Sequence, residues 1–312
     1  MIVAAAIILD HLIGDPINRF HPVYYIGKTI SSLESILIGI GRSPSFKKMA
    51  GILLLFLMTS ISLSVVALMM WAGAFLPYGV EAVSVFWFWS VISPRSLKNS
   101  ASKISALIKD GDIKGSRERL SMLVSRDTSK LDETEISRAT IESVAENSVD
   151  GVIAPLVYAL IGGPYLAVLY RTVNTLDSMV GYKNEKYIDF GWASAKADDL
   201  LNFIPARISR YLFAISSIFT TGRGKEALSK SFAYGGKHDS PNSGIPEASM
   251  AGTLGLKLGG PASYFGNLEK REYLGDGRHP RVSDILRSVS VLNTVTALCF
   301  FSCIAWEVAK AW

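Results

Sequence analysis

The chain has 312 residues, of which 49% are hydrophobic and only 19% charged, and its mean hydropathy is +0.29. Soluble globular proteins carry about 25% charged residues, so this composition excludes a disordered chain and argues against an ordinary soluble enzyme. Charged residues are missing from a few long windows and crowd elsewhere. That distribution is typical of a polytopic membrane protein with sizeable polar loops.

The net charge of +5 is too mild to indicate a nucleic-acid-binding protein, which would show a clustered basic stripe and usually a recognition motif. We therefore expect no nucleic-acid partner. The only cysteines, Cys299 and Cys303, lie in an apolar run and are expected to pack as small hydrophobic residues. No disulfide framework and no zinc motif is present.

Three segments are predicted to cross a membrane: residues 50–76, 80–93 and 289–309. The first contains no charged residue and is long enough to span, and a Pro-Tyr-Gly turn joins it to the second as a transmembrane hairpin. Residues 1–9 are too short to span and lack the pattern of a removed signal peptide. This segment is predicted to form a half-helix or an interfacial anchor that brings Asp10 to the membrane surface.

Two further apolar segments leave the number of crossings open. Residues 152–170 are interrupted by Gly162-Gly163-Pro164, which favours a re-entrant helical hairpin over one continuous span. Residues 203–220 carry Arg207 and Arg210 at helical spacing, which favours a helix lying in the interface. The re-entrant and interfacial interpretations would keep the polar flanks of both segments on one side.

The polar regions between these segments are also predicted to be helical. Asp132 and Glu135 form a capping box that predicts the start of a helix. No strand alternation is sustained and no internal repeat is visible. The predicted fold is therefore mainly α: a single domain over residues 1–312, a polytopic helical membrane protein with a re-entrant or interfacial helical hairpin, whose polar helical loops form the site.

Acidic residues near the N-terminus form the first candidate site. Asp10 and Asp15 flank a glycine, and His21 follows them. One or two carboxylates together with substrate phosphate oxygens suit Mg²⁺. The alternative is a polar turn that ends a membrane helix.

A second candidate site is a run of acids at helical spacing. Glu142, Glu146 and Asp150 lie at steps of four, which places them on one helical stripe beside Asn147. Like charges at this spacing repel one another, so a metal or a cationic substrate would compensate them. An ordinary exposed acidic helix is the alternative.

Polar side chains that flank apolar segments form the third candidate site. They are Arg171, Asn174, Asp177, Asp198, Asp199 and Asn202. Such residues indicate function when they face the protein interior, although interface snorkelling explains Arg171 and Arg207 equally well.

The fourth candidate is the Ser240–Gly244 loop, followed by a stretch of small residues that runs from Ala248 to Gly260. Its backbone amides could cradle a phosphate, but it lacks the P-loop pattern. Together the four clusters predict an acidic, amide-rich site at the membrane interface, suited to Mg²⁺-phosphate chemistry. A transporter with intramembrane carboxylates would look broadly similar.

Strings at these clusters, in order along the chain, resemble the cobalamin-biosynthesis CbiB/CobD family, the adenosylcobinamide-phosphate synthases. They are Asp10-His11-Leu12-Ile13-Gly14-Asp15-Pro16, His21-Pro22-Val23 with Ile26-Gly27, Ser125-Arg126-Asp127-Thr128, Glu142-Ser143-Val144-Ala145-Glu146-Asn147-Ser148-Val149-Asp150-Gly151, Asn174-Thr175-Leu176-Asp177-Ser178-Met179-Val180-Gly181-Tyr182-Lys183, Asp198-Asp199 with Asn202, Pro205-Ala206-Arg207, Ser240-Pro241-Asn242, Leu258-Gly259-Gly260-Pro261 and Tyr264-Phe265-Gly266. The resemblance covers essentially the whole chain, and its central strings are long and specific.

The resemblance implies a multi-pass enzyme of the cell membrane with its active site on the cytoplasmic side. Such an enzyme would use ATP and Mg²⁺ to join (R)-1-amino-2-propanol O-phosphate, or a related amino alcohol phosphate, to the corrinoid adenosylcobyric acid. The product amide is adenosylcobinamide phosphate. A homo-oligomer, or association with other enzymes of the corrin pathway, would be compatible with this role.

We assign roles to the residues on this basis. The expected catalytic residues are Glu142, Glu146, Asp150 and Asp177. The expected metal ligands are Glu142, Glu146, Asp177, Asp198 and Asp199. The expected substrate-binding residues are Asp10, Asp15, His21, Arg126, Asn147, Arg171, Asn174, Lys183, Asn202, Arg207, Ser240 and Asn242. The interpretation requires these side chains to converge at one pocket beside the bilayer.

Two other functions fit the sequence less well. A CDP-alcohol phosphotransferase needs the motif Asp-Gly-x-x-Ala-Arg, but Asp150-Gly151 is followed by Ile153-Ala154-Pro155 and the arginine is missing. A transporter of a corrinoid or an ion would show polar residues within several full spans and inverted repeats. Here the polar strings lie mostly between the apolar segments.

Overall fold

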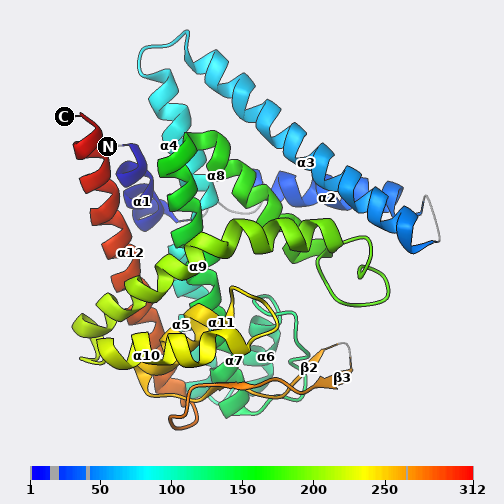
Figure 1. Ribbon diagram of the computed structural model, residues 1–312. Helices are drawn as coiled ribbons and strands as arrows, with labels where there is room; N and C mark the ends of the chain where they lie inside the picture. Colours follow the sequence, from blue (N-terminus) through cyan, green and yellow to red (C-terminus); the bar gives the residue numbers. More distant parts are fainter. Residues whose placement is uncertain (1, 15–20, 40–42, 265, 312) are drawn as a thin grey trace. The chain divides into compact units, whose positions relative to one another are not determined.

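The computed structural model describes residues 2–14, 21–39, 43–264 and 266–311, and this part of the chain is mainly helical (Figure 1). The mainly α fold expected from the sequence is confirmed. The first helices are α1 (Ile2–Ile13), α2 (Pro22–Leu37), α3 (Pro44–Gly73), α4 (Gly79–Val91), α5 (Pro94–Lys109), α6 (Ile113–Leu120) and α7 (Glu133–Ser148). A π-helical turn (Val149–Ile153) leads into α8 (Ala154–Val180), followed by α9 (Trp192–Thr220), α10 (Gly224–Tyr234), a 3₁₀ turn (Gly235–Lys237), α11 (Gly244–Leu254) and α12 (Val282–Ala311).

The described strands are short and lie between α11 and α12. They are β1 (Leu258–Gly259), β2 (Ala262–Tyr264), β3 (Asn267–Glu269) and β4 (Tyr273–Leu274). β1 pairs with β4 and β2 pairs with β3, both antiparallel. The four strands therefore form two small antiparallel pairs in a described chain that is mainly helical.

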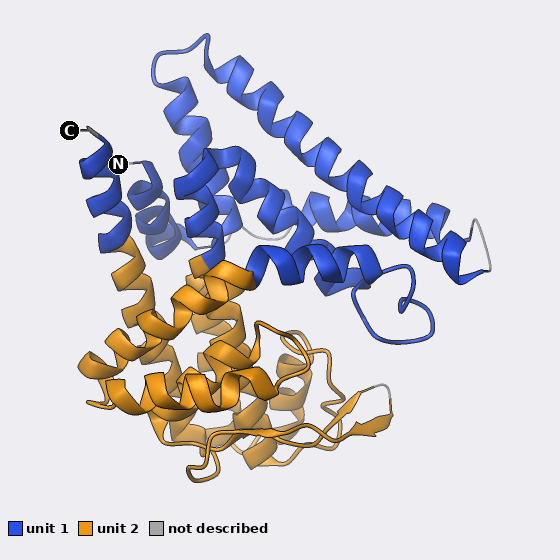
Figure 2. Cartoon of the chain, in the orientation of Figure 1, with its two compact units in different colours: residues 1–93, 154–202, 301–312 blue, residues 94–153, 203–300 orange. Residues whose placement is uncertain are grey.

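The chain divides into two compact units (Figure 2). Unit 1 comprises Met1–Ser93, Ala154–Asn202 and Phe301–Trp312, and unit 2 comprises Pro94–Ile153 and Phe203–Phe300. The single domain predicted from the sequence stays a prediction, and each unit is described by itself below.

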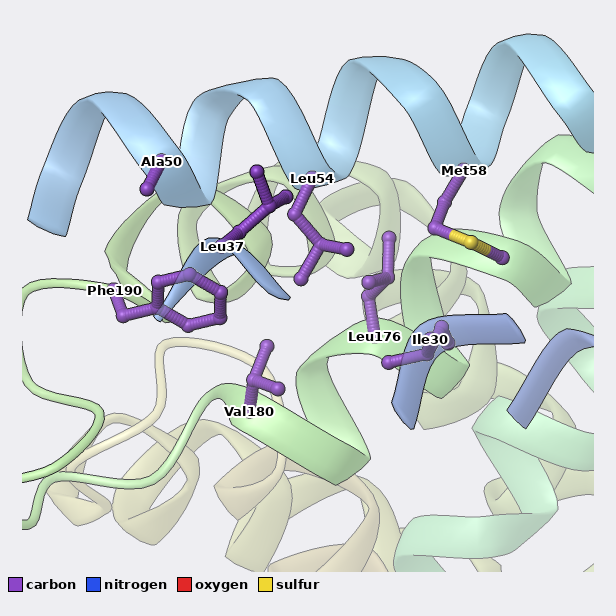
Figure 3. Packing of buried hydrophobic residues seen from close by; sticks show 8 residues of the cluster. All are labelled: Ile30, Leu37, Ala50, Leu54, Met58, Leu176, Val180 and Phe190. Carbon is purple, nitrogen blue, oxygen red and sulfur yellow. The ribbon is translucent and has the colours of Figure 1, made fainter. Parts of the chain in front are cut away.

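The core of unit 1 forms where α2, α3 and α8 meet. Figure 3 shows Leu54 and Met58 of α3 beside Ile30 of α2 and Leu176 of α8, all fully or almost fully buried. Burying a side chain of this size stabilises a fold by about 1.5–3 kcal/mol. Gly51 allows α3 to approach closely, because a Cβ there would lie 1.8 Å from the carbonyl oxygen of Phe190.

Helix α8 is broken where the sequence predicted the tip of a hairpin. Gly163 has φ 63° and ψ −153°, a backbone conformation open essentially only to glycine, and Gly162 is also non-helical. Pro164 then begins the second half, a position where its missing N–H costs nothing. Figure 1 shows the chain changing direction sharply at this break. The predicted interruption is confirmed, while its position in a bilayer stays a prediction.

Three helical runs of the described chain are long and apolar enough to cross a membrane: Pro44–Gly73, Glu133–Val180 and Val282–Lys310. They contain most of predicted span 50–76 and all of predicted segments 152–170 and 289–309. The predicted crossing at 80–93 corresponds to α4, whose 13 residues extend about 20 Å. That length is shorter than a hydrocarbon core of about 30 Å, and the crossing at 80–93 stays a prediction. Residues 203–220 lie within α9, which is not among the three runs.

Unit 2 is built around α11, whose residues from Gly244 to Leu254 are all buried. The helix packs against α7 and α10. Gly252 makes the contact with α10 possible, because a Cβ there would lie 2.5 Å from the carbonyl oxygen of Glu226. Helix α7 begins with the predicted capping box between Asp132 and Glu135, which is confirmed.

Candidate functional site

A buried ion pair anchors the polar cluster of unit 2. Arg126, in the bend between α6 and α7, pairs with the Glu142 carboxylate on α7, and both side chains are buried. The other Glu142 oxygen accepts the N–H of Gly259 at 2.7 Å. Burial alone would lower the pKa of Arg126, but the adjacent Glu142 carboxylate outweighs it and holds that pKa above its usual value. Both oxygens of Glu142 are therefore already engaged by a cation and an N–H donor.

The glycines of the Leu258–Pro261 string shape the backbone that meets α7. Gly259 and Gly260 both have positive φ, 66° and 84°, where a side chain would be strained. In this conformation the carbonyl oxygens of Gly259 and Pro261 accept hydrogen bonds from Arg138, the latter at 3.0 Å. Arg138 and Glu142, which lie one turn apart on α7, therefore both bind the backbone of the Leu258–Pro261 string.

The Ser125–Thr128 string ties its loop to the β2–β3 pair. Asp127 accepts hydrogen bonds from the Ser263 hydroxyl at 2.9 Å and from the N–H of Gly266 at 2.8 Å. Neighbouring residues of this string therefore have separate partners, because Arg126 binds α7 and Asp127 binds the strands.

Glu146 lies one turn after Glu142 and contacts the loop before α11. The Ser243 hydroxyl donates to Glu146 at 2.8 Å. In the same loop, Ser240 accepts the N–H groups of Asn242 and Ser243, each at 3.3 Å. Arg207 of α9 donates to the Asn242 side chain at 3.3 Å. The structure thus links the predicted residues Glu146, Ser240, Asn242 and Arg207 in unit 2.

The other two residues predicted beside them have different surroundings. Asn147 donates to the carbonyl oxygen of Ser143 on its own helix at 2.9 Å. Asp150 lies in the π-helical turn after α7, where the α-helical period no longer applies. The stripe predicted from steps of four therefore holds strictly for Glu142 and Glu146, and the π turn displaces Asp150 from it.

A carboxylate that the sequence analysis missed lies beside these residues. Glu247, in the first turn of α11, is 3% exposed. His238 Nε2 is 3.7 Å from its Oε1, and Arg271 contacts the same ring nitrogen. Burial, reinforced by the nearby Glu142 and Glu146 carboxylates, raises the pKa of Glu247 well above its usual value. One feature of the sequence could have identified this residue: Glu247 is the only charged residue between Asp239 and Lys257.

Unit 1 holds a second polar cluster, in which α8 and α9 bring four of the predicted residues together. Asp198 accepts hydrogen bonds from Asn174 at 3.3 Å and from Asn202 at 3.0 Å. Asn202 in turn accepts the hydroxyl of buried Tyr170 at 3.0 Å, and Arg171 lies within 3.5 Å of the Asn174 side-chain oxygen. This cluster matches the grouping predicted for residues flanking the apolar segments.

The remaining predicted residues of unit 1 lie at separate places along its elements. Asp10 is buried near the end of α1, and His21 caps α2 by accepting the N–H of Val23 at 3.2 Å. Lys183 is exposed after α8, and Asp199 pairs with Lys196 at 3.5 Å. Asp177 lies near the end of α8. Predicted residue Asp15 is outside the described residues.

The metal and catalytic assignments stay predictions. Among the residues that the structure describes, no three His, Cys, Asp or Glu side chains gather closely enough to hold a metal ion. Since Glu142 also has both oxygens engaged by other groups, the surroundings of Glu142 do not fit a metal ligand. The predicted residues belong to both units, so their convergence at one pocket also stays a prediction.

Long apolar helices combined with a buried cluster of arginines and glutamates define a helical, membrane-type protein with a charged internal site. The family model described as CobD/Cbib protein matches residues 3–292, and the chain belongs to this family, which acts in cobalamin biosynthesis. The match extends across both units.

Three similar proteins are each named cobalamin biosynthesis protein CobD. The protein from Clostridium perfringens is 42% identical over 298 residues, covering 93% of this chain and 92% of the relative. The protein from Geobacter metallireducens is 43% identical, covering 89% and 87%, and the one from Klebsiella pneumoniae is 38% identical, covering 93% and 92%. No solved structure matches the chain.

Proposed function

We propose that this protein catalyses the ATP-dependent formation of an amide between adenosylcobyric acid and an amino alcohol phosphate such as (R)-1-amino-2-propanol O-phosphate. The observation that carries the proposal is the mixed charge of the cluster in unit 2. An amino alcohol phosphate bears a cationic ammonium group and an anionic phosphate on one small molecule. Arg271, Glu146 and Glu247 offer both kinds of complementary charge in unit 2.

The chemistry explains why both charges are needed. A carboxylate is a poor acylating agent, so transfer of the ATP γ-phosphoryl group to it gives an acyl phosphate with a good leaving group. The amine then attacks the acyl carbon, phosphate departs with the electron pair of the broken C–O bond, and the ammonium proton passes to a base. Cations that stabilise phosphate and a nearby carboxylate base suit these steps.

The cations of the proposal belong to unit 2. In unit 2, Arg207 and Arg271 are the cations we assign to phosphate, because Arg126 is already neutralised by Glu142. The substrates, and any association with a second copy or with other enzymes of the pathway, belong to the proposal.

Magnesium enters the proposal with the nucleotide. Mg²⁺ commonly binds through one or two carboxylates together with substrate phosphates, and Asp177, Asp198 and Asp199 stay its predicted ligands. When bound, Mg²⁺ would neutralise phosphate charge. We place the site at the cell membrane, on the cytoplasmic side where ATP is available.

The experiment is direct. Purified protein in detergent is incubated with adenosylcobyric acid, (R)-1-amino-2-propanol O-phosphate and ATP-Mg²⁺, and the amide is sought by mass spectrometry. We expect the amide only when ATP and Mg²⁺ are both present. A folded Glu146→Gln variant should lose most of this activity, whereas Glu226→Gln, at an exposed position on α10, should keep it. Absence of the amide from the complete wild-type mixture would refute the proposed reaction.

A further inference from the structure

Helix α11 contains one charged side chain, and that side chain is buried. All eleven residues from Gly244 to Leu254 are buried, and Glu247 is 3% exposed. Its Oε2 atom has no hydrogen-bond partner among the residues that the structure describes. Buried polar atoms almost always have a partner in native proteins, and leaving a carboxylate without one is costly. This oxygen therefore points to a missing donor.

The groups that face Glu247 show which donors are already engaged elsewhere. His238 accepts the N–H of Ser240 at Nδ1 at 2.9 Å, and its Nε2 lies 3.7 Å from Glu247 Oε1, beyond hydrogen-bond distance. Arg271 contacts the His238 ring and donates to the Tyr264 hydroxyl oxygen at 2.9 Å. None of the described cationic side chains therefore donates a hydrogen bond to Glu247 Oε2, and this oxygen can accept one from a ligand.

Two neighbouring arginines do not change this conclusion. Arg126 is committed to Glu142, and Arg138 donates to the carbonyl oxygens of Gly259 and Pro261. Arg126 acts on Glu247 through space, while the hydrogen bonds given for both arginines go to other partners.

The charge of the cluster identifies the chemical class of the missing donor. At Glu247 the electrostatic effects of the Glu142 and Glu146 carboxylates are each larger than those of Arg271 and Arg126, which act in the opposite direction, so a cation is favoured over an anion at Oε2. A metal ion is not favoured, since no three His, Cys, Asp or Glu side chains among the described residues gather to hold one. A primary ammonium group, which carries three N–H donors, fits a single carboxylate oxygen beside further acids.

We propose that Glu247 is the ammonium-binding residue of this site and that its Oε2 accepts an N–H of the amino alcohol phosphate. This inference rests on the proposed function and deepens it. The His238 ring contacts both Glu247 and the guanidinium of Arg271. Ammonium and phosphate groups two carbons apart on one ligand match a carboxylate and a guanidinium placed close together.

The surroundings of Glu247 add a measurable signature. Burial first, and the Glu142 and Glu146 carboxylates second, raise the pKa of Glu247, while Arg271 and Arg126 oppose this effect. An arriving ammonium group favours the ionised carboxylate, so binding should release a proton. A ligand with the phosphate and without the amine should not cause this release from Glu247.

The test compares two ligands by titration calorimetry on the full-length protein in detergent. They are (R)-1-amino-2-propanol O-phosphate and isopropyl phosphate, which lacks the amine. We expect the wild type to prefer the amine-bearing ligand by about ten- to a hundredfold, the range for hydrogen bonds to charged groups. Glu247→Gln should lose that preference and bind isopropyl phosphate as the wild type does. Glu226→Gln is the matched control, because Glu226 is also in the first turn of a helix but is exposed.

The buffer dependence of the wild-type binding enthalpy provides a second measurement that needs no variant. Proton release with the amine-bearing ligand and none with isopropyl phosphate is the expected result. An unchanged preference in folded Glu247→Gln, or a wild type that does not distinguish the two ligands, would overturn the inference. A preference that Glu247→Gln abolishes, in a protein that forms no amide, would retain the ammonium site and refute only the proposed ligation.

Discussion

Ser243 donates a 2.8 Å hydrogen bond to Glu146, a residue 97 positions earlier in the chain. The bond joins the loop before α11 to the acidic face of α7, and both side chains are partly exposed. The backbone N–H of Ser243 also donates a hydrogen bond to the Ser240 hydroxyl oxygen. One serine thus positions the Glu146 carboxylate relative to the Ser240–Asn242 loop.

Replacement of Ser243 by alanine should weaken catalysis more than stability. A hydrogen bond to a charged group contributes about 1.5–3 kcal/mol, and water can replace it at a partly exposed site. We therefore expect about a tenfold loss of kcat/KM for ligation, with little change in thermal unfolding. Ser229→Ala, at an exposed position on α10, serves as the control. Equal activities of the two variants would contradict a positioning role for Ser243.

The Arg126–Glu142 pair should be primarily a stability element. Removing one partner of a buried ion pair costs about 3–5 kcal/mol, because the other charge is left buried alone. Glu142→Gln should therefore lower the free energy of unfolding by about this amount, measured by unfolding in detergent. The exposed Lys114–Glu118 pair is the control, since Glu118→Gln should cost less than about 1 kcal/mol.

A double variant separates this ion pair from unrelated effects. Arg126→Ala combined with Glu142→Gln should cost clearly less than the sum of the single changes, because contacting residues are not additive. Strict additivity would show that the two side chains do not stabilise each other.

The break in α8 depends on the conformation of Gly163. Gly163→Ala should destabilise the protein by about 1–3 kcal/mol, since a Cβ is strained at this φ and ψ. Gly39→Ala is a matched control in the same unit: a Cβ at either glycine meets nothing within 4 Å, and only Gly163 has a positive φ. Thermal unfolding in detergent measures both. Equal losses would remove backbone strain as the reason for glycine at 163.

Glu247 should make stability depend on pH in a defined direction. Burial, together with Glu142 and Glu146, raises its pKa in the folded protein, so the folded state binds this proton more tightly than the unfolded state. Its contribution to stability is complete below the pKa of an unfolded glutamate, about 4.3. That contribution falls by up to about 1.4 kcal/mol per pH unit as pH rises toward the folded pKa.

The measurement compares wild type with Glu247→Gln at increasing pH. Glutamine cannot ionise, so the variant should become progressively more stable than the wild type as pH rises above the ordinary glutamate range. Glu226→Gln should follow the wild-type curve. A wild-type profile parallel to that of Glu247→Gln at every pH would show that Glu247 titrates normally.

Much of the fold could be predicted because local rules determine it. The long apolar run within α3, the capping box of α7 and the Gly162-Gly163 break each depend on neighbouring residues. The crossing at 80–93 stays a prediction, because the apolar segment predicts a span and its helix, α4, has 13 residues. Helix boundaries depend on tertiary packing, which composition does not report.

The candidate site could be predicted only in part, because its contacts join distant segments. The spacing of Asn174, Asp198 and Asn202 beside apolar segments led to a cluster that the structure contains. No local pattern places Gly259 against Glu142, which lie 117 positions apart. Glu247 was missed because it is surrounded in sequence by small, uncharged residues, a context typical of close helix packing.

The two cysteines of α12 offer a practical route to the topology of the protein. Cys299 and Cys303 are 7% and 2% exposed, so a membrane-impermeant maleimide should leave the native chain unlabelled. No thiol has to be removed before reporter cysteines are introduced one at a time. Labelling of such reporters in intact and permeabilised cells would assign each loop to its side of the bilayer.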